Sequence, residues 1–165
     1  MRVLGIDPGM RIMGWAVLDQ STAGVIKYIA GGSVHTAQDD AVARRLYKIF
    51  HSLDQIIQEL KPNYAAIEEV FVNSNAKSSL ALGFARGAIL SSLGKNDITT
   101  YEFAPNRIKK TIVGNGKADK NQVMKMLSLV IPGVEFKSVD EADAVAIAYT
   151  GIIYKSSVYT KSHIK

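Results

Sequence analysis

The chain opens with short apolar runs that turn-forming residues interrupt. Val3–Asp7 is such a run, and Pro8-Gly9 follows it, so we expect a strand that is buried on both faces and ends at Asp7. Ile12–Leu18 and Val25–Val34 are further strand candidates, separated by a polar stretch that contains glycine. The first part of the chain therefore predicts a three-stranded meander.

Strands and helices alternate after the meander. Apolar residues recur at three- and four-residue steps over Val42–Leu60, before Pro62, which predicts an amphipathic helix covering the sheet. We then expect a strand over Tyr64–Glu69, a helix rich in small residues over Asn75–Leu93 and a strand over Ile98–Phe103. Such alternation implies parallel crossovers, so the sequence predicts an α/β fold with a five-stranded mixed sheet flanked by helices.

The rest of the chain predicts helices. Residues 104–137 contain a short helical stretch, a glycine-containing loop at 114–116 and a second helix over about Lys120–Val130. A last helix is expected over Val139–Tyr154. We therefore expect one domain over residues 1–154, followed by a polar, basic tail over 155–165.

Carboxylates fall where these elements would meet. Asp7 ends the first predicted strand and Glu68-Glu69 end the fourth, and ligand sites in open α/β sheets gather beyond strand carboxyl ends. Because successive strand residues point to opposite faces, only one of Glu68 and Glu69 can join Asp7. Asp140 and Asp143 are spaced i, i+3 at the start of the last helix, so they share a face.

Each acid also has an ordinary structural explanation. Asp7 belongs to a common turn sequence, Glu68 and Glu69 would be solvated if their strand ended earlier, and acids in a first helical turn stabilise it by ~0.3–1 kcal/mol each. Together, however, they form an oxygen-only cluster of the kind that binds magnesium. Two such ions about 3.5–4 Å apart can support phosphodiester hydrolysis. The leading hypothesis is a metal-dependent phosphoryl-transfer site.

Composition excludes several other chemistries. The 165 residues include no cysteine, which excludes disulfides, thiolate metal sites and cysteine nucleophiles and fits the cytoplasm. We expect no signal peptide and no membrane span, because no apolar stretch approaches about 20 residues. His35, His51 and His163 lack metal-ligand spacing. Gly116-Lys117 fails as a phosphate-binding loop because Ala118 replaces the hydroxyl residue.

Positive charge is concentrated in one segment. The chain has a net charge of +5, and residues 107–125 alone hold six basic residues against the single acid Asp119. This segment precedes the acidic helix, so it is a candidate to hold a phosphate backbone there; an ordinary solvated face is the alternative. Phe71, just after the strand acids, is a candidate wedge or base-stacking residue, or part of the core. The basic residues are Arg107, Lys109, Lys110, Lys117, Lys120 and Lys125.

Four segments at family-like spacing resemble the RuvC Holliday-junction resolvases of bacteria. The likeness covers about residues 2–150 and rests on Leu4-Gly5-Ile6-Asp7-Pro8-Gly9, Ala66-Ile67-Glu68-Glu69-Val70-Phe71, Lys109-Lys110-Thr111-Ile112-Val113-Gly114 and Asp140-Glu141-Ala142-Asp143-Ala144. The resemblance implies a ribonuclease H-like fold, a homodimer and paired symmetric nicks in a four-way DNA junction, as in recombination and repair. It also implies magnesium dependence and a junction-binding and branch-migration complex as partner. We expect two ions per site, with manganese able to replace magnesium.

The resemblance also implies roles for single residues. Asp7, Glu68, Asp140 and Asp143 match the catalytic, metal-binding tetrad, which selects Glu68 over Glu69. By the same comparison Lys109 and Lys120 match lysines near the active site, and Phe71 matches an aromatic residue that contacts the junction. Arg107, Lys110 and Lys117 are further candidates for DNA binding.

A two-fold dimer would supply two sites for two symmetric cuts. Gly83 and Gly87 lie four residues apart, near Ala81, Ala85 and Ala88, and small residues permit close helix approach, so this helix is a candidate interface; packing on its own sheet is the alternative. Two other functions stay open. One is a junction-binding protein without catalysis, and the other is a nucleotide binder of the sugar-kinase or actin type, which needs a much longer chain.

Overall fold

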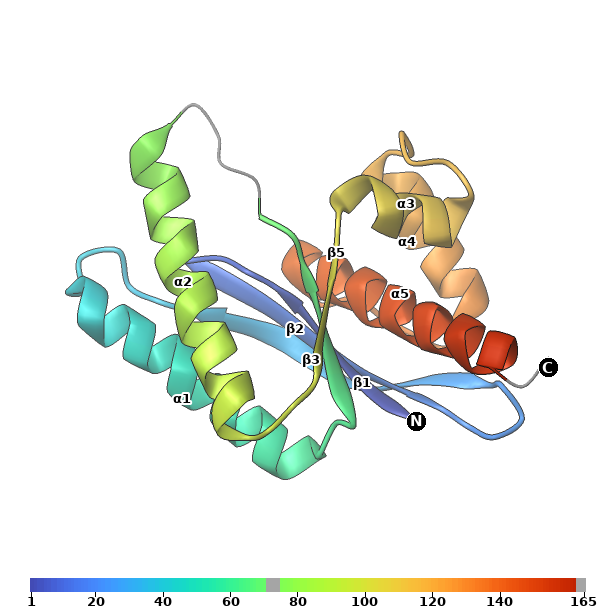
Figure 1. The fold of residues 1–165 in the computed structure, drawn as a ribbon. Helices are drawn as coiled ribbons and strands as arrows, with labels where there is room; N and C mark the ends of the chain where they lie inside the picture. The colour runs from blue at the N-terminus through green and yellow to red at the C-terminus, as the bar shows by residue number, and fades with distance from the viewer. Residues whose placement is uncertain (71–74, 163–165) are drawn as a thin grey trace.

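A computed structural model describes residues 1–70 and 75–162 and contains a single five-stranded sheet in that part of the chain (Figure 1). The strand order is β3-β2-β1-β4-β5; β1 to β3 pair antiparallel, and β4 and β5 run parallel to β1. The expected mixed α/β sheet is confirmed. The strands are β1 (Arg2–Asp7), β2 (Ile12–Gln20), β3 (Ile26–His35), β4 (Tyr64–Glu68) and β5 (Thr100–Phe103).

Helices cover both faces of the sheet (Figure 1). The helices α1 (Val42–Leu60) and α2 (Ala76–Lys95) pack on one face. The other face carries α5 (Val139–Ser162), with α3 (Pro105–Val113) and α4 (Lys120–Val130) outside it. None of the helices in the described part of the chain combines the length and apolar composition needed to cross a bilayer.

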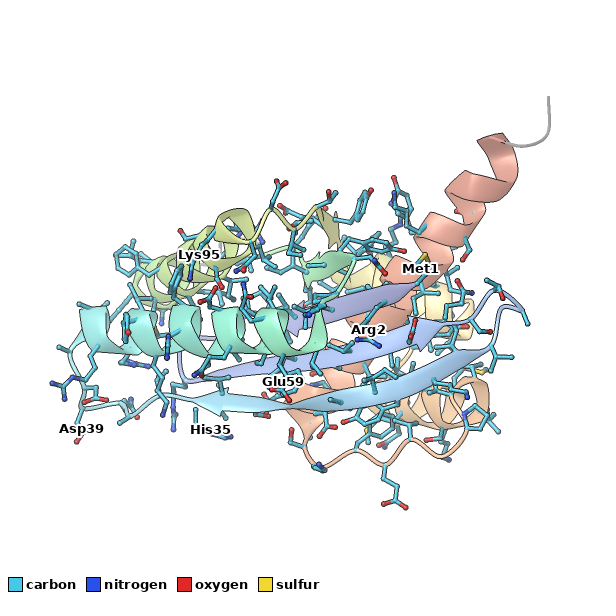
Figure 2. The ribbon with its side chains drawn as sticks, turned by 90° about the horizontal axis from the view of Figure 1, so that it is seen from below. Met1, Arg2, His35, Asp39, Glu59 and Lys95 are labelled. Carbon is cyan, nitrogen blue, oxygen red and sulfur yellow. The ribbon has the colours of Figure 1, made fainter. Side chains whose placement is uncertain are left out.

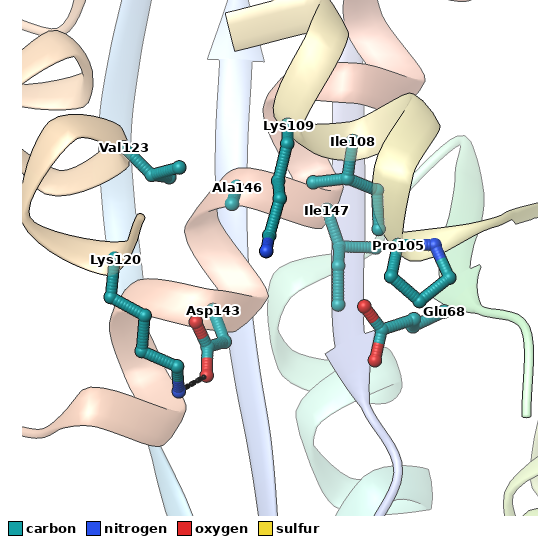
Figure 3. Close-up of a pocket in the computed structure, with 9 residues that line it drawn as sticks. All are labelled: Glu68, Pro105, Ile108, Lys109, Lys120, Val123, Asp143, Ala146 and Ile147. Carbon is teal, nitrogen blue, oxygen red and sulfur yellow. Dashed lines mark hydrogen bonds and ion pairs between the residues drawn. The ribbon is translucent and has the colours of Figure 1, made fainter. Parts of the chain in front are cut away.

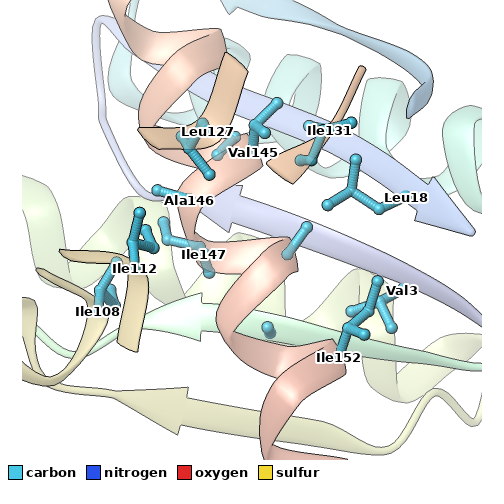
Figure 4. Close-up of a cluster of buried hydrophobic side chains, with 14 of the residues drawn as sticks. Val3, Leu18, Ile108, Ile112, Leu127, Ile131, Val145, Ala146, Ile147 and Ile152 are labelled. Carbon is cyan, nitrogen blue, oxygen red and sulfur yellow. The ribbon is translucent and has the colours of Figure 1, made fainter. Parts of the chain in front are cut away.

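Side-chain alternation along β1 divides the hydrophobic core into two layers. Val3 packs in the layer under α5 (Figure 4), whereas Leu4 and Ile6 pack in the layer under α1 and α2. Since side chains of a strand alternate between faces, Asp7 lies on the same face as Val3. The core pattern thus directs Asp7 toward α5.

The helix α5 lies unusually close to the sheet because glycines face it. A Cβ added at Gly5 would stand 2.1 Å from the carbonyl oxygen of Ala144, and one at Gly14 would stand 2.1 Å from that of Asp140. No side chain fits between backbones at such a distance. The first turns of α5 are therefore held against β1 and β2 by direct backbone packing.

The sequence predicts that the last helix ends at Tyr154, but α5 continues to Ser162. The ring of Tyr154 packs against that of Tyr101, with 5.4 Å between centroids. The next residue, Lys155, places its ammonium 5.5 Å from the ring centroid of Tyr64 and 5.1 Å from that of Tyr101. These contacts extend the helix over residues expected to form a tail, because they bury the stem of a charged side chain against aromatic rings.

The start of β1 is fastened at the end of the sheet opposite Asp7. The amino group of Met1 forms a 3.1 Å ion pair with Asp19, and Arg2 donates from Nη1 to the carbonyl oxygen of Leu60 at 2.6 Å (Figure 2). The strand that ends at Asp7 is thus held at both ends, by these contacts and by α5.

Candidate active site

Four carboxylates meet at one end of the sheet. Asp7 ends β1 and Glu68 ends the neighbouring parallel strand β4, in which Ile67 is the partner of Ile6. Asp140 and Asp143 lie in the first turns of α5, which packs over the same end of the sheet. Segments that are distant in sequence therefore converge because two strands and one helix end together.

Burial and mutual repulsion both act on the carboxylates. Burial raises the pKa of Asp7 to about 7, helped by the charges of Asp143, Glu68 and Asp140 and opposed by Lys120. Burial and the charge of Asp143 also raise the pKa of Glu68. The site therefore gathers negative charge that a bound cation would relieve.

Two lysines share a cavity with two of the acids (Figure 3). Lys120 donates from Nζ to Oδ2 of Asp143 at 2.8 Å, and this bond raises the pKa of Lys120. Lys109 and Glu68 line the same cavity, which has a volume of about 190 Å³. Its remaining wall is largely apolar and consists of Pro105, Ile108, Val123, Ala146 and Ile147.

The other predicted basic residues lie elsewhere. The guanidinium carbon of Arg107 stands 5.3 Å from the ring centroid of Phe103 and 5.2 Å from that of Tyr154, so this side chain joins α3 to β5 and α5. Lys110 and Lys117 are exposed and are not among the residues that line the cavity. The structure thus places Lys109 and Lys120 at the carboxylates and the others on the outer surface.

The motif that contains Glu68 also contains Glu69 and Phe71. Glu69 donates its backbone N–H to the carbonyl oxygen of Phe103 at 2.9 Å, and the carboxylates that act on the pKa of Asp7 include Glu68 but not Glu69. The geometry therefore agrees with the choice of Glu68. Phe71 lies outside the described residues.

Sequence reasoning overlooked Glu141, which lies between the two acids of α5. Its side chain is fully buried, with 0% exposed, and it accepts a hydrogen bond from the hydroxyl of Tyr28 on β3. The sequence does carry a signal, because the alanines Ala142 and Ala144 beside it indicate a helix packed closely on its neighbours. The partner on β3 could not be identified that way.

The four carboxylates fit magnesium by their chemistry. They offer only oxygen donors, which Mg²⁺ prefers, and the pKa of Asp7 is raised, chiefly by burial and further by the three neighbouring carboxylates, despite Lys120. Within residues 1–70 and 75–162, no three acidic or histidine side chains already surround a common point. Asp143, paired with Lys120, would have to exchange that partner for an ion.

Known proteins match this chain over most of its length. Residues 3–151 match the sequence model of the family described as "Crossover junction endodeoxyribonuclease RuvC". A protein of that name from Rickettsia bellii (strain RML369-C) is 49% identical over 157 residues, which cover 94% of this chain and 99% of the relative. The corresponding protein of Rickettsia felis is 49% identical over 151 residues, covering 91% and 96%.

Solved structures of resolvases also match this chain. RuvC of Thermus thermophilus in complex with Holliday junction substrate superimposes with a TM-score of 0.90 at 27% identity, covering 96% of both chains. The yeast mitochondrial Holliday junction resolvase Ydc2 shares the fold, with a TM-score of 0.71 at 15% identity over 96% of this chain and 80% of its own. The converging carboxylates, the fold and these relatives agree, and the chain belongs to the RuvC family of crossover junction endodeoxyribonucleases.

Proposed function

We propose that this chain resolves four-way DNA junctions by paired symmetric nicks, each made by magnesium-dependent hydrolysis at the carboxylate cluster. The observation that carries the proposal is Asp7, a partly buried acid whose pKa is raised to about 7 beside three further carboxylates. A cluster of this kind is costly to keep ionised unless a cation balances it. The relative from Thermus thermophilus was solved with a Holliday junction substrate, which supports the same substrate here.

The roles of the acidic residues follow from their chemistry. Asp7, Glu68, Asp140 and Asp143 would hold two magnesium ions, for which manganese can substitute. When bound, magnesium supplies Lewis acidity and a lower pKa for water, which suits in-line attack on a phosphodiester and yields 5′-phosphate and 3′-hydroxyl ends. Backbone packing at Gly14 holds the start of α5, which carries Asp140 and Asp143, against the strand end that carries Asp7, and Asp143 would exchange Lys120 for an ion.

The cavity lysines complement the phosphate. Lys109 and Lys120 line the wall that also holds Glu68 and Asp143, so a phosphodiester entering the cavity meets two ammonium groups as well as the acids. They reduce the repulsion between an anionic backbone and anionic ligands. Lys120 donates to Asp143, and we infer that it transfers to a phosphate oxygen when the junction binds and Asp143 takes an ion.

The surface around the cavity would bind the DNA backbone. Lys110 and Lys117 are exposed near the cavity helices α3 and α4, and such residues neutralise phosphates without reading sequence. Arg107, although stacked on aromatic rings, is exposed and can still face a phosphate. We propose that Phe71 stacks on or wedges between bases at the junction, as its place in the family motif suggests.

A homodimer would use the outer face of α2. Two faces of this helix differ: Ala85 is buried against the sheet, while Gly83 and Gly87 are exposed. Along the glycine face, 58% of Leu80 and 44% of Phe84 are exposed. Apolar side chains spaced to form one exposed stripe favour contact with a second copy of this chain, which would place two active sites at a fixed separation.

The proposed setting is the bacterial cytoplasm, with a junction-binding and branch-migration complex as partner. The curated relatives are bacterial, which supports the setting. This partner is inferred from the family resemblance. Binding of the complex to this protein in the presence of a four-way junction would test it.

The decisive experiment compares a synthetic four-way junction with a linear duplex of matched sequence, each with and without magnesium. We expect symmetric nicks confined to the junction, and only with the metal. Binding of the junction without any nick, in magnesium or manganese, would favour a non-catalytic binding protein. ATP-dependent turnover of a small molecule would favour the nucleotide-binding alternative.

A further inference from the structure

Glu141 is a buried carboxylate whose two oxygens are both hydrogen-bonded. Its Oε1 accepts from the hydroxyl of Tyr28 on β3 at 2.5 Å, and its Oε2 accepts from the backbone N–H of Lys137 at 3.0 Å. Burial of a carboxylate is costly unless such bonds satisfy it. The position of Glu141 is therefore specified by two directional contacts, one of them 113 residues away in sequence.

A second contact attaches the same helix start to β3. Ser138 accepts a hydrogen bond from the backbone N–H of Glu141 at 3.1 Å, as a helix-capping residue does. Its hydroxyl also lies 2.9 Å from that of Ser33 on β3. A capping glutamate at this position would account for the bond from Lys137 but not for the bond from Tyr28 on another element. The burial of Glu141 against Tyr28 thus goes beyond what a helix end requires.

Glycines on two strands leave no free space around this attachment. A Cβ added at Gly31 would stand 3.0 Å from Oε1 of Glu141 and 2.9 Å from the hydroxyl of Tyr28. At Gly14 it would stand 2.1 Å from the carbonyl oxygen of Asp140. The helix start can neither slide nor turn without breaking the bonds of Glu141 or colliding with β2.

We propose that Tyr28 and Glu141 are positioning residues, which fix the rotation and depth of the first turns of α5 and so the placement of Asp140 and Asp143 relative to Asp7. The inference rests on the proposed function, in which these aspartates are metal ligands. Neither Tyr28 nor Glu141 is a ligand in this scheme. They act through the backbone of α5, because Glu141 lies between the two aspartates on the same turn.

The first test is Tyr28→Phe, which keeps the ring and removes only the hydroxyl. We expect Mn²⁺ to bind the DNA-free protein about ten-fold more weakly, measured by calorimetry, because partners behind metal ligands typically contribute 10- to 100-fold. The turnover number for junction nicking should fall by a similar factor, while junction affinity measured with EDTA stays unchanged. Tyr149→Phe makes the same chemical change farther along α5 and should leave Mn²⁺ binding unchanged.

A pair of substitutions at Glu141 adds a graded comparison. Glu141→Gln keeps an acceptor for Tyr28 or for Lys137, whereas Glu141→Ala removes both bonds, so we expect glutamine to retain more Mn²⁺ affinity and more activity than alanine. Circular dichroism establishes which variants are folded. If Glu141→Ala does not fold, Tyr28→Phe and Glu141→Gln decide the question.

Asp143→Asn distinguishes the positioning role of Tyr28 and Glu141 from the proposed assignment of the metal ligands. If Asp143→Asn loses Mn²⁺ binding and nicking while folded Tyr28→Phe and Glu141→Gln match the parent in both, the positioning role is wrong and the ligand assignment stands. If Asp143→Asn also binds Mn²⁺ and nicks normally, the ligand assignment itself is wrong. A loss confined to thermal stability, with Mn²⁺ binding unchanged, would likewise overturn the positioning role.

Discussion

Both faces of the sheet carry an apolar core, and they differ in the contacts that are added to it. Beneath α1 and α2, apolar side chains such as Leu4, Ile49 and Ile89 fill the space between sheet and helices, and the outer side of α2 leaves Leu80 and Phe84 exposed. Beneath α5, backbone meets backbone at Gly5 and buried polar groups are hydrogen-bonded. The comparison teaches that backbone packing and buried hydrogen bonds are added to the apolar core on the face proposed for chemistry, whereas the face proposed for assembly keeps apolar side chains exposed on its outer helix.

The largest expected effect would come from removing one charge on the α5 face. Asp7→Asn should lower junction nicking by about 1,000-fold or more, because one of the four carboxylates proposed to hold the ions is lost, while junction binding persists. Nicking of a labelled four-way junction under single-turnover conditions measures the rate. Asp97→Asn is the matched control, since Asp97 is exposed, has a left-handed φ of 53° that asparagine also adopts, and lies away from the carboxylates.

The same substitution should stabilise the metal-free protein. The folded-state pKa of Asp7 is raised from 3.8 to about 7, so the folded protein holds the proton more tightly than the unfolded chain, and the stability of the parent falls as pH rises between these values. Above pH 7 Asp7→Asn avoids this penalty, which we place at roughly 2–4 kcal/mol. Urea unfolding with EDTA at pH 4 and pH 8 measures it; an equal gain at both values would contradict this origin.

For Asp54 on α1 we expect the opposite dependence of stability on pH. Its carboxylate bonds with Lys95 at 2.6 Å and with Asn96, which lowers its pKa. A lowered pKa adds stability above the unfolded-state value and loses it as pH falls. Asp54→Asn should therefore destabilise the protein slightly at neutral pH and not at low pH, in the same urea experiment. A gain in stability at neutral pH would mean that Asp54 and Asp7 affect stability in the same direction, which would contradict this expectation.

An aspartate on the apolar stripe should disrupt assembly. Leu80→Asp places a like-charged pair at or near the two-fold interface, and we expect the dimer to dissociate roughly 10- to 100-fold more readily. Analytical ultracentrifugation measures the dissociation constant. Leu129→Asp on α4 makes the identical change at a side chain that is 73% exposed on the other face, and it should leave the dimer intact.

The smallest expected effect concerns the outer lysines. Lys110→Ala should weaken junction binding only a few-fold and reduce the slope of log K against log salt by about 0.9, the value for one phosphate contact. Titrations in EDTA at several salt concentrations measure it. An unchanged slope would place Lys110 away from the DNA.

How far the sequence predicts the structure also differs between the faces. The bounds of α1, Val42–Leu60, follow from its apolar spacing and from Pro62, and they are confirmed. The end predicted for the last helix is wrong: residues after Tyr154 look polar, whereas α5 continues to Ser162 and Lys155 lies over the rings of Tyr64 and Tyr101. Local patterns are sufficient for an amphipathic helix on a sheet, but not where distant residues supply the contacts.

In the site, too, some features follow from local patterns and others depend on distant residues. Strand ends and a helix start place Asp7, Glu68, Asp140 and Asp143 together, so their meeting could be predicted from the order of elements. The resemblance, rather than charge alone, distinguished Lys109 and Lys120 from the other basic residues, and the structure places both in the cavity. The stacking of Arg107 and the burial of Glu141 depend on partners far away in the chain, which no local pattern identifies.

Direct backbone packing at Gly5 and Gly14 bears on how such a chain can diverge over evolution. The spacing between β1 and α5 is fixed by atoms that all residues share, not by the shape of particular side chains. Neighbouring positions are then free to accumulate substitutions, provided that these glycines remain. A side chain at Gly5 or Gly14 would push α5 away from the sheet, whereas changes elsewhere can leave the placement of the proposed ligands intact.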